Sequence, residues 1–169
     1  MAQAQITAEE TSKHSHPEKW EWYHYFWYNI DHKVIGIQYL VTAFFFYLIA
    51  GLMAMGIRVE LYTPDPDFLD PNVYNSFLTN HGTMMIFFWI VPAAIGGFGN
   101  YLIPLMIGTR DLAFPNLNAI AFWLNPVAGL LLMISLYFGG AQAGWTSYPP
   151  LSIITNNAGQ SFWILAIEI

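Results

Sequence analysis

Charged side chains are scarce in this sequence. Asp, Glu, Lys and Arg make up 9% of the 169 residues, whereas a soluble domain carries about 25%. The charges also cluster, which leaves uncharged stretches at 34–57, 71–109 and 112–167. Each stretch is longer than the roughly 20 residues of one membrane-spanning helix. This pattern excludes a soluble enzyme and a disordered tail, and it indicates that lipid surrounds most of the chain.

Basic residues and cysteine are the other shortages. Lys and Arg together number five, so no basic patch exists to neutralise phosphates, and a nucleic-acid partner is excluded. The absence of cysteine excludes a disulfide framework, a thiolate zinc site and an iron–sulfur cluster. Any metal ligand must therefore be a histidine, a carboxylate or a methionine.

Apolar residues are abundant: 56% of the chain is hydrophobic and 18% is aromatic. We predict an all-α polytopic transmembrane helical bundle over residues 34–169, preceded by a mobile polar tail at 1–19. Between them, an aromatic segment at 20–33 is typical of an interfacial helix at the level of the lipid headgroups. The expected spans are 34–58, 77–107 and 117–138, followed by the start of a fourth at 161–169. Because the sequence stops inside that element, we expect a fragment of a longer protein.

Loop charges predict the orientation of an integral membrane protein. Lys13, Lys19 and Lys33 precede the first expected span, whereas the loop after it is acidic. The positive-inside rule then places the N-terminus in the cytoplasm. With three spans, Asp111 falls on the cytoplasmic side and Trp145 on the outer side.

His81 is the only histidine inside an expected span, about 6 Å from its outer end by helical rise. It is either hydrogen-bonded near a helix start beside Asn80, or a ligand for a metal or haem. Arg58 ends the first span at about the same expected level. It either holds a polar group of a cofactor or snorkels to the interface.

Asp111 follows the second expected span, with Asn100 and Asn118 above it. An acid below two amides could feed a water-filled route for protons. The alternative is a loop acid paired with Arg110, with the two amides packing between helices. Glu60 and the other loop carboxylates after the first span either bind Ca²⁺ or carry solvated charge.

Several tracts together carry a resemblance to a known family. They include Asp31-His32-Lys33, Asn80-His81, Gly96-Gly97-Phe98-Gly99-Asn100, Ala113-Phe114-Pro115 and Gly144-Trp145-Thr146. Over about Asp31 to Leu151 the sequence resembles subunit I of the haem-copper oxygen reductases, in the A-type group that contains cytochrome c oxidase. Some of its short sequence tracts are similar to those of the cyanobacterial members. The resemblance implies the first part of a twelve-span subunit.

The resemblance also implies roles for individual residues. His81 is implied to be one axial ligand of a low-spin haem, of type a or alternatively b or o. Arg58 is implied to contact a ring substituent of that haem, and Trp145 to lie near its propionates. Asp111 is implied to be the entrance acid of a proton pathway that Asn100 and Asn118 line. Glu60 is implied to be one ligand of an outer cation site. Asn116 and Ala119 depart from the family pattern near the pathway mouth.

The implied enzyme is a terminal respiratory oxidase that reduces O₂ to water with proton pumping. Its high-spin haem and copper belong to later helices, so the 169 residues alone are not expected to be active. Implied partners are the rest of subunit I, subunits II and III, the lipid bilayer, and cytochrome c or another small electron donor, with quinol as the alternative. The expected location is a bacterial plasma membrane, or a thylakoid membrane. A non-catalytic transporter or scaffold segment is the alternative of a different class.

Overall fold

The structure is a computed structural model that describes residues 21–62, 64–65, 68–155 and 157–169. The predicted tail at 1–19 lies outside these residues. Within the described ranges every regular element is helical, as predicted. Three helices are long and apolar enough to cross a membrane: α2 (His32–Glu60), a continuous helix Pro71–Ile107, and α5 (Pro115–Tyr137).

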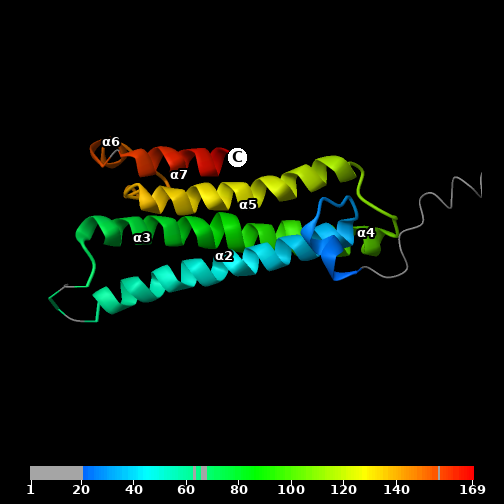
Figure 1. Cartoon of the computed structure of the whole chain (residues 1–169), viewed down its shortest axis with the longest axis horizontal. Helices are drawn as coiled ribbons and strands as arrows, with labels where there is room; N and C mark the ends of the chain where they lie inside the picture. The colour runs from blue at the N-terminus through cyan, green and yellow to red at the C-terminus, as the bar shows by residue number, and fades with distance from the viewer. Residues whose placement is uncertain (1–20, 63, 66–67, 156) are drawn as a thin grey trace, which may run out of the picture.

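The middle helix runs antiparallel to α2 and to α5, and α7 (Ala158–Glu168) lies along α5 (Figure 1). A single turn, α6 (Leu151–Ile154), lies in the connection between α5 and α7. We call the two ends of the bundle the Glu60 end, where α2 finishes, and the Asp111 end, where α2 begins. The loops that carry Asp111 and Trp145 therefore lie at opposite ends, at the right and left of Figure 1.

The middle helix changes its winding along its length. It starts as α3 (Pro71–Thr83), continues as the wide π-type segments η2 (Met84–Ile90) and η3 (Pro92–Gly99), and finishes as α4 (Asn100–Ile107). Between the two segments, the N–H of Val91 bonds to the carbonyl of Ile86, five residues back. Pro92 has no N–H and would interrupt a regular ladder. The wider turns keep the helix continuous past this proline.

The middle helix begins six residues before the expected position 77. Its first turns are rich in polar residues, which hides them from a search for apolar runs. The physical start signal is Asp70, whose carboxylate accepts from the N–H of Asn72, followed by Pro71 in the first turn. Asp31 caps α2 in the same way, accepting from Lys33 N at 2.8 Å.

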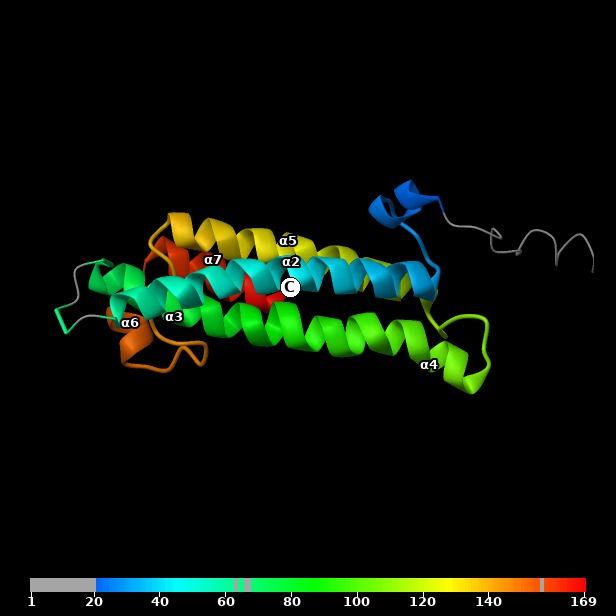
Figure 2. The ribbon, with the colours of Figure 1, turned by 90° about the horizontal axis from the view of Figure 1, so that it is seen from below.

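The aromatic segment forms less helix than expected. Among the described residues its regular part is a single 3₁₀ turn, η1 (Trp22–Phe26), rather than a helix along the whole segment. The side-chain amide of Gln38 donates to the carbonyls of Tyr25 and Trp27 at 3.0 and 3.1 Å, so these carbonyls point at α2 instead of continuing a helical ladder. Figure 2 shows η1 at the same end of the bundle as α4. Most of its aromatic side chains remain exposed.

Small residues let the helices pack closely. A Cβ on Gly129 of α5 would lie 1.9 Å from the ring of Phe46 on α2. A Cβ on Gly36 would lie 2.9 Å from the carbonyl oxygen of Gly97. The buried apolar cluster at the centre includes Phe46, Ala50, Met53, Met84, Phe88, Leu132 and Trp163. Only 22%, 22% and 33% of the apolar stretches of the three long helices are buried, so most of their surface is open to lipid or to further helices.

Candidate functional site

His81 lies on α3 and packs against α2. Its ring Nδ1 is 2.9 Å from the carbonyl oxygen of Ala50. Because a carbonyl can only accept, Nδ1 carries the proton and the lone pair of the neutral ring is on Nε2. A backbone acceptor on one ring nitrogen is the usual way in which a protein orients a metal-ligating imidazole. This bond leaves Nε2 as the ring atom with a free lone pair.

The surroundings of His81 are open on two sides. Gly51 follows the Ala50 acceptor, and Gly82 follows the histidine itself. A Cβ at Gly51 or Gly82 would meet no atom within 4 Å. His81 itself is only partly buried. The imidazole is therefore held by α2, and the neighbouring positions Gly51 and Gly82 are open.

Arg58 is not at the level of His81, contrary to the expectation from sequence. His81 bonds to Ala50, and Arg58 lies eight residues further along α2, or about 12 Å of helix. The reason is the early start of α3, which places His81 ten residues, or about 15 Å, from Pro71. Arg58 is exposed in the last turn of α2.

Glu60 holds the loop between α2 and α3. Its Oε2 accepts from the N–H groups of Phe68 at 3.1 Å and Leu69 at 2.7 Å. The residue is 6% exposed, so these charge-assisted bonds form in a largely dry setting. The geometry assigns Glu60 a loop-holding role, and its service in a cation site stays a prediction.

Trp145 lies in a loop that is hydrogen-bonded to α3, the helix that carries His81. The N–H of Gly144 donates to the hydroxyl of Thr79 at 3.0 Å, two residues before the histidine. The indole lies 6.0 Å from the ring of Phe87, centre to centre, and is half exposed. The structure therefore ties Trp145 and His81 to α3, although they are far apart in sequence.

Asp111 has a neighbour that sequence reasoning missed. Nδ1 of His32 lies 3.7 Å from Oδ1 of Asp111, and the same oxygen accepts from the N–H of Leu112 at 2.7 Å. The His32 side chain is 3% exposed, and that of Asp111 22%. A topological argument could have found this pair, because an antiparallel bundle brings the start of its first helix beside the loop that follows its second.

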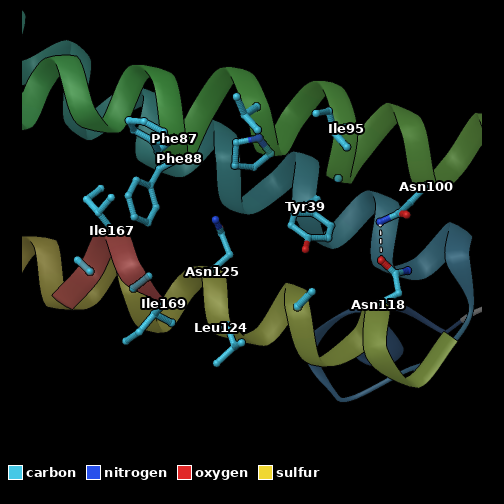
Figure 3. Close-up of a pocket in the computed structure, with 16 residues that line it drawn as sticks. Tyr39, Phe87, Phe88, Ile95, Asn100, Asn118, Leu124, Asn125, Ile167 and Ile169 are labelled. Atoms are coloured by element: carbon cyan, nitrogen blue, oxygen red, sulfur yellow. Dashed lines mark hydrogen bonds between the residues drawn. The ribbon is translucent and has the colours of Figure 1, made fainter. Parts of the chain in front are cut away.

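Above Asp111, the two predicted amides meet. Nδ2 of Asn100 donates to Oδ1 of Asn118 at 3.0 Å. This pair borders a cavity of about 380 Å³ between α2, the middle helix, α5 and α7, and Figure 3 shows Tyr39 beside the pair. The structure thus brings the two predicted amides together, at the end of the bundle where Asp111 lies. His81 and Arg58 lie toward the other end of the bundle.

Comparison with known sequences decides the family. Residues 34–169 match the family described as cytochrome c and quinol oxidase polypeptide I. The chain belongs to this family. It is 71% identical over 168 residues to cytochrome c oxidase subunit 1 of Thermostichus vulcanus, covering 99% of this chain and 30% of that protein.

Other relatives agree with this membership in the oxidase subunit I family. The chain is 56% identical over 160 residues to cytochrome c oxidase subunit 1 of Synechocystis sp., covering 95% of this chain and 29% of that protein. It is 45% identical over 141 residues to the Bacillus subtilis protein of the same name, covering 83% of this chain and 22% of that protein. The chain therefore spans less than a third of the length of these curated relatives.

The donor set at His81 fits the haem that an oxidase subunit I implies. Among the described residues, no three His, Cys, Asp or Glu side chains gather to hold a metal ion. A haem iron needs the protein only at its axial positions. A single imidazole with a fixed tautomer, next to the open positions Gly51 and Gly82, can supply one axial ligand. It does not match a metal site built from several protein ligands.

Proposed function

We propose that this chain supplies one axial ligand of the low-spin haem, and the entrance of a proton route, in a terminal respiratory oxidase. The observation that carries the haem part is the bond from His81 Nδ1 to the Ala50 carbonyl, which leaves Nε2 for iron. Family membership supports the reaction class. The proton part rests on Asp111 and the bonded amides Asn100 and Asn118.

A bound low-spin haem supplies one-electron transfer from the donor toward the haem-copper centre. His81 would hold its iron, and Arg58 would contact a ring substituent at the far edge. Trp145, on the loop anchored to α3, would lie against the propionates. We propose haem a. The b and o types stay as alternatives, because an imidazole and an arginine suit all three rings.

At the Asp111 end, the carboxylate would collect protons from the cytoplasm. The Asn100–Asn118 pair would bind water in the passage above it without changing its own protonation. The partly exposed Asp111 side chain can exchange protons with solvent. The proposal places the N-terminus in the cytoplasm, in a bacterial plasma membrane or a thylakoid membrane.

The complete enzyme would reduce O₂ to water and pump protons. The rest of subunit I would supply the high-spin haem and copper, and subunits II and III would complete the complex. Cytochrome c is the proposed donor, because the relatives named above are cytochrome c oxidases. The family description also includes quinol oxidases. Copper in the docking subunit of the purified complex would indicate the cytochrome c type, and its absence the quinol type.

The test is His81→Ala in the complete complex, with His24→Ala as the matched control near the N-terminus. We expect the absorption bands of the low-spin haem to disappear in the first variant and to persist in the second. Persisting bands in His81→Ala would show that this residue is not the ligand. A wild-type complex without any haem bands would remove the oxidase function altogether.

A further inference from the structure

The cavity beside the Asn100–Asn118 pair contains polar atoms without hydrogen-bond partners. Oδ1 of Asn125 and Nδ2 of Asn118 are both buried, and the described residues offer neither of them a bond. A buried amide atom left in this state costs free energy, so native proteins satisfy such atoms with protein groups or with water. These two atoms therefore indicate where water binds.

Asn118 and Asn125 lie on the same face of α5. Asn118, Ala121 and Asn125 follow one another at helical spacing, and all three line the cavity. Asn118 and Asn125 are seven residues apart, or about 10 Å along the helix. Figure 3 shows Asn125 on the far side of Tyr39 from the Asn100–Asn118 pair. Polar groups thus recur along the cavity, from its border with the pair to the neighbourhood of Phe88.

The space is large enough for water. The cavity measures about 380 Å³, whereas one water needs roughly 10–15 Å³ of such volume and two to four polar partners. The remaining walls are largely apolar, with Val91, Ile95 and Leu124 among them. Water would therefore gather along the amides and the tyrosine rather than fill the cavity evenly.

We propose that Asn125 is a further residue of the proton route, holding the waters that continue it beyond Asn118. This inference rests on the proposed function. The amide neither gains nor loses a proton: Oδ1 accepts a hydrogen bond from one water and Nδ2 donates one to another. An excess proton entering from the Asp111 side is passed between waters, each accepting one proton and releasing one, so one proton leaves at the Asn125 end. Asn125 is thus a positioning residue that directs the waters.

The test uses the complete oxidase with Asn125→Leu, which keeps the size of the side chain and removes both polar atoms. We expect turnover to fall about tenfold, as for the loss of one hydrogen bond in a rate-limiting step. The solvent isotope effect on turnover should rise, because proton delivery becomes limiting, and the haem spectrum should not change. Asn125→Ser, which is polar and leaves room for water, should restore most of the turnover.

Ser135→Ala is the matched control on the same helix, because Ser135 donates to the Gly159 carbonyl at 2.8 Å and does not line this cavity. We expect normal turnover and isotope effect there. A haem-loaded Asn125→Leu oxidase with wild-type turnover and an unchanged isotope effect overturns the proposal. If that variant assembles without haem, Ala121→Leu, which narrows the cavity between the amides, decides by the same measurements.

Failure of this inference is distinct from failure of the proposed function. If Asp111→Asn slows proton uptake and Asn125→Leu does not, only the role of Asn125 is lost. If the wild-type complex has no haem, the haem part of the proposed function is wrong. If Asp111→Asn has no effect, the proton part is wrong.

Discussion

The ring Nδ1 of His32 lies 3.7 Å from the carboxylate Oδ1 of Asp111. His32 is the first residue of α2, and Asp111 lies in the loop between α4 and α5. The two meet because the start of one long helix and the end of the next share one end of the bundle. A buried imidazole therefore borders the carboxylate at the proposed proton entrance, and this carboxylate is the first target for a test.

Asp111→Asn should reduce turnover by at least about tenfold, because an amide cannot take up and release a proton at this position. The low-spin haem bands should persist, since His81 lies toward the opposite end of the bundle. Oxygen consumption and the visible spectrum of the complex measure both effects. Asp70→Asn is the control, because Asn caps a helix as well as Asp does. Full turnover in Asp111→Asn would exclude the residue from proton uptake.

Glu60→Ala should loosen the loop between α2 and α3. The amides of Phe68 and Leu69 lose their shared acceptor, and a hydrogen bond to a charged group contributes about 1.5–3 kcal/mol. Hydrogen exchange at these two amides should accelerate by tenfold or more, measured by mass spectrometry on the intact complex. Glu60→Gln, which keeps an acceptor oxygen, should show a smaller change. Unchanged exchange in Glu60→Ala would contradict the loop-holding role.

Gly129→Ala should destabilise the bundle by about 1–3 kcal/mol. The added Cβ would lie 1.9 Å from the ring of Phe46, so the ring or one of the two helices must move. Gly99→Ala is the control, because its Cβ would meet its nearest neighbour at an ordinary 3.6 Å. Thermal unfolding of the complex, followed by loss of haem absorption, measures the effect. Combining Gly129→Ala with Phe46→Leu should recover part of the lost stability.

Thr79→Val should release the loop that carries Trp145. The change keeps the shape of the side chain but leaves the Gly144 N–H without its 3.0 Å acceptor, at a cost of about 1–3 kcal/mol. Faster exchange of the Gly144 amide, with the haem ligand bands still present, is the expected result. Thr79→Ser keeps the hydroxyl and should behave as the wild type does. Equal exchange in both variants would show that the loop has another anchor.

Much of the fold was predictable because the membrane imposes simple rules. Uncharged runs long enough to span a bilayer predicted the three long helices. The start of the middle helix was missed because the polar residues after Pro71 interrupt the apolar pattern. Helix caps are local, however, and this one could have been read from the sequence: Asp70 followed by Pro71 is a start signal in its own right.

The candidate site was harder to predict, because contacts between helices decide it. His81 stood out as an ionisable residue within a span, but the Ala50 carbonyl that sets its tautomer depends on how α2 and α3 pack. Asn125, an uncharged amide within a long apolar helix, did not stand out in the sequence. Its buried oxygen became informative once the face of α5 that lines the cavity was known. The sequence periodicity of one helix cannot show whether a polar atom will have a hydrogen-bond partner on a neighbouring helix.

The acceptor that orients His81 belongs to the backbone of residue 50 and not to a side chain. Every amino acid has that carbonyl, so no substitution at position 50 deletes the bond. On the acceptor side, a point mutation can alter the bond only indirectly, by moving α2 relative to α3, and Ala50 is fully buried at that contact. The acceptor that orients the imidazole is therefore protected from loss by substitution at position 50, and it responds to changes in the distance between the two helices.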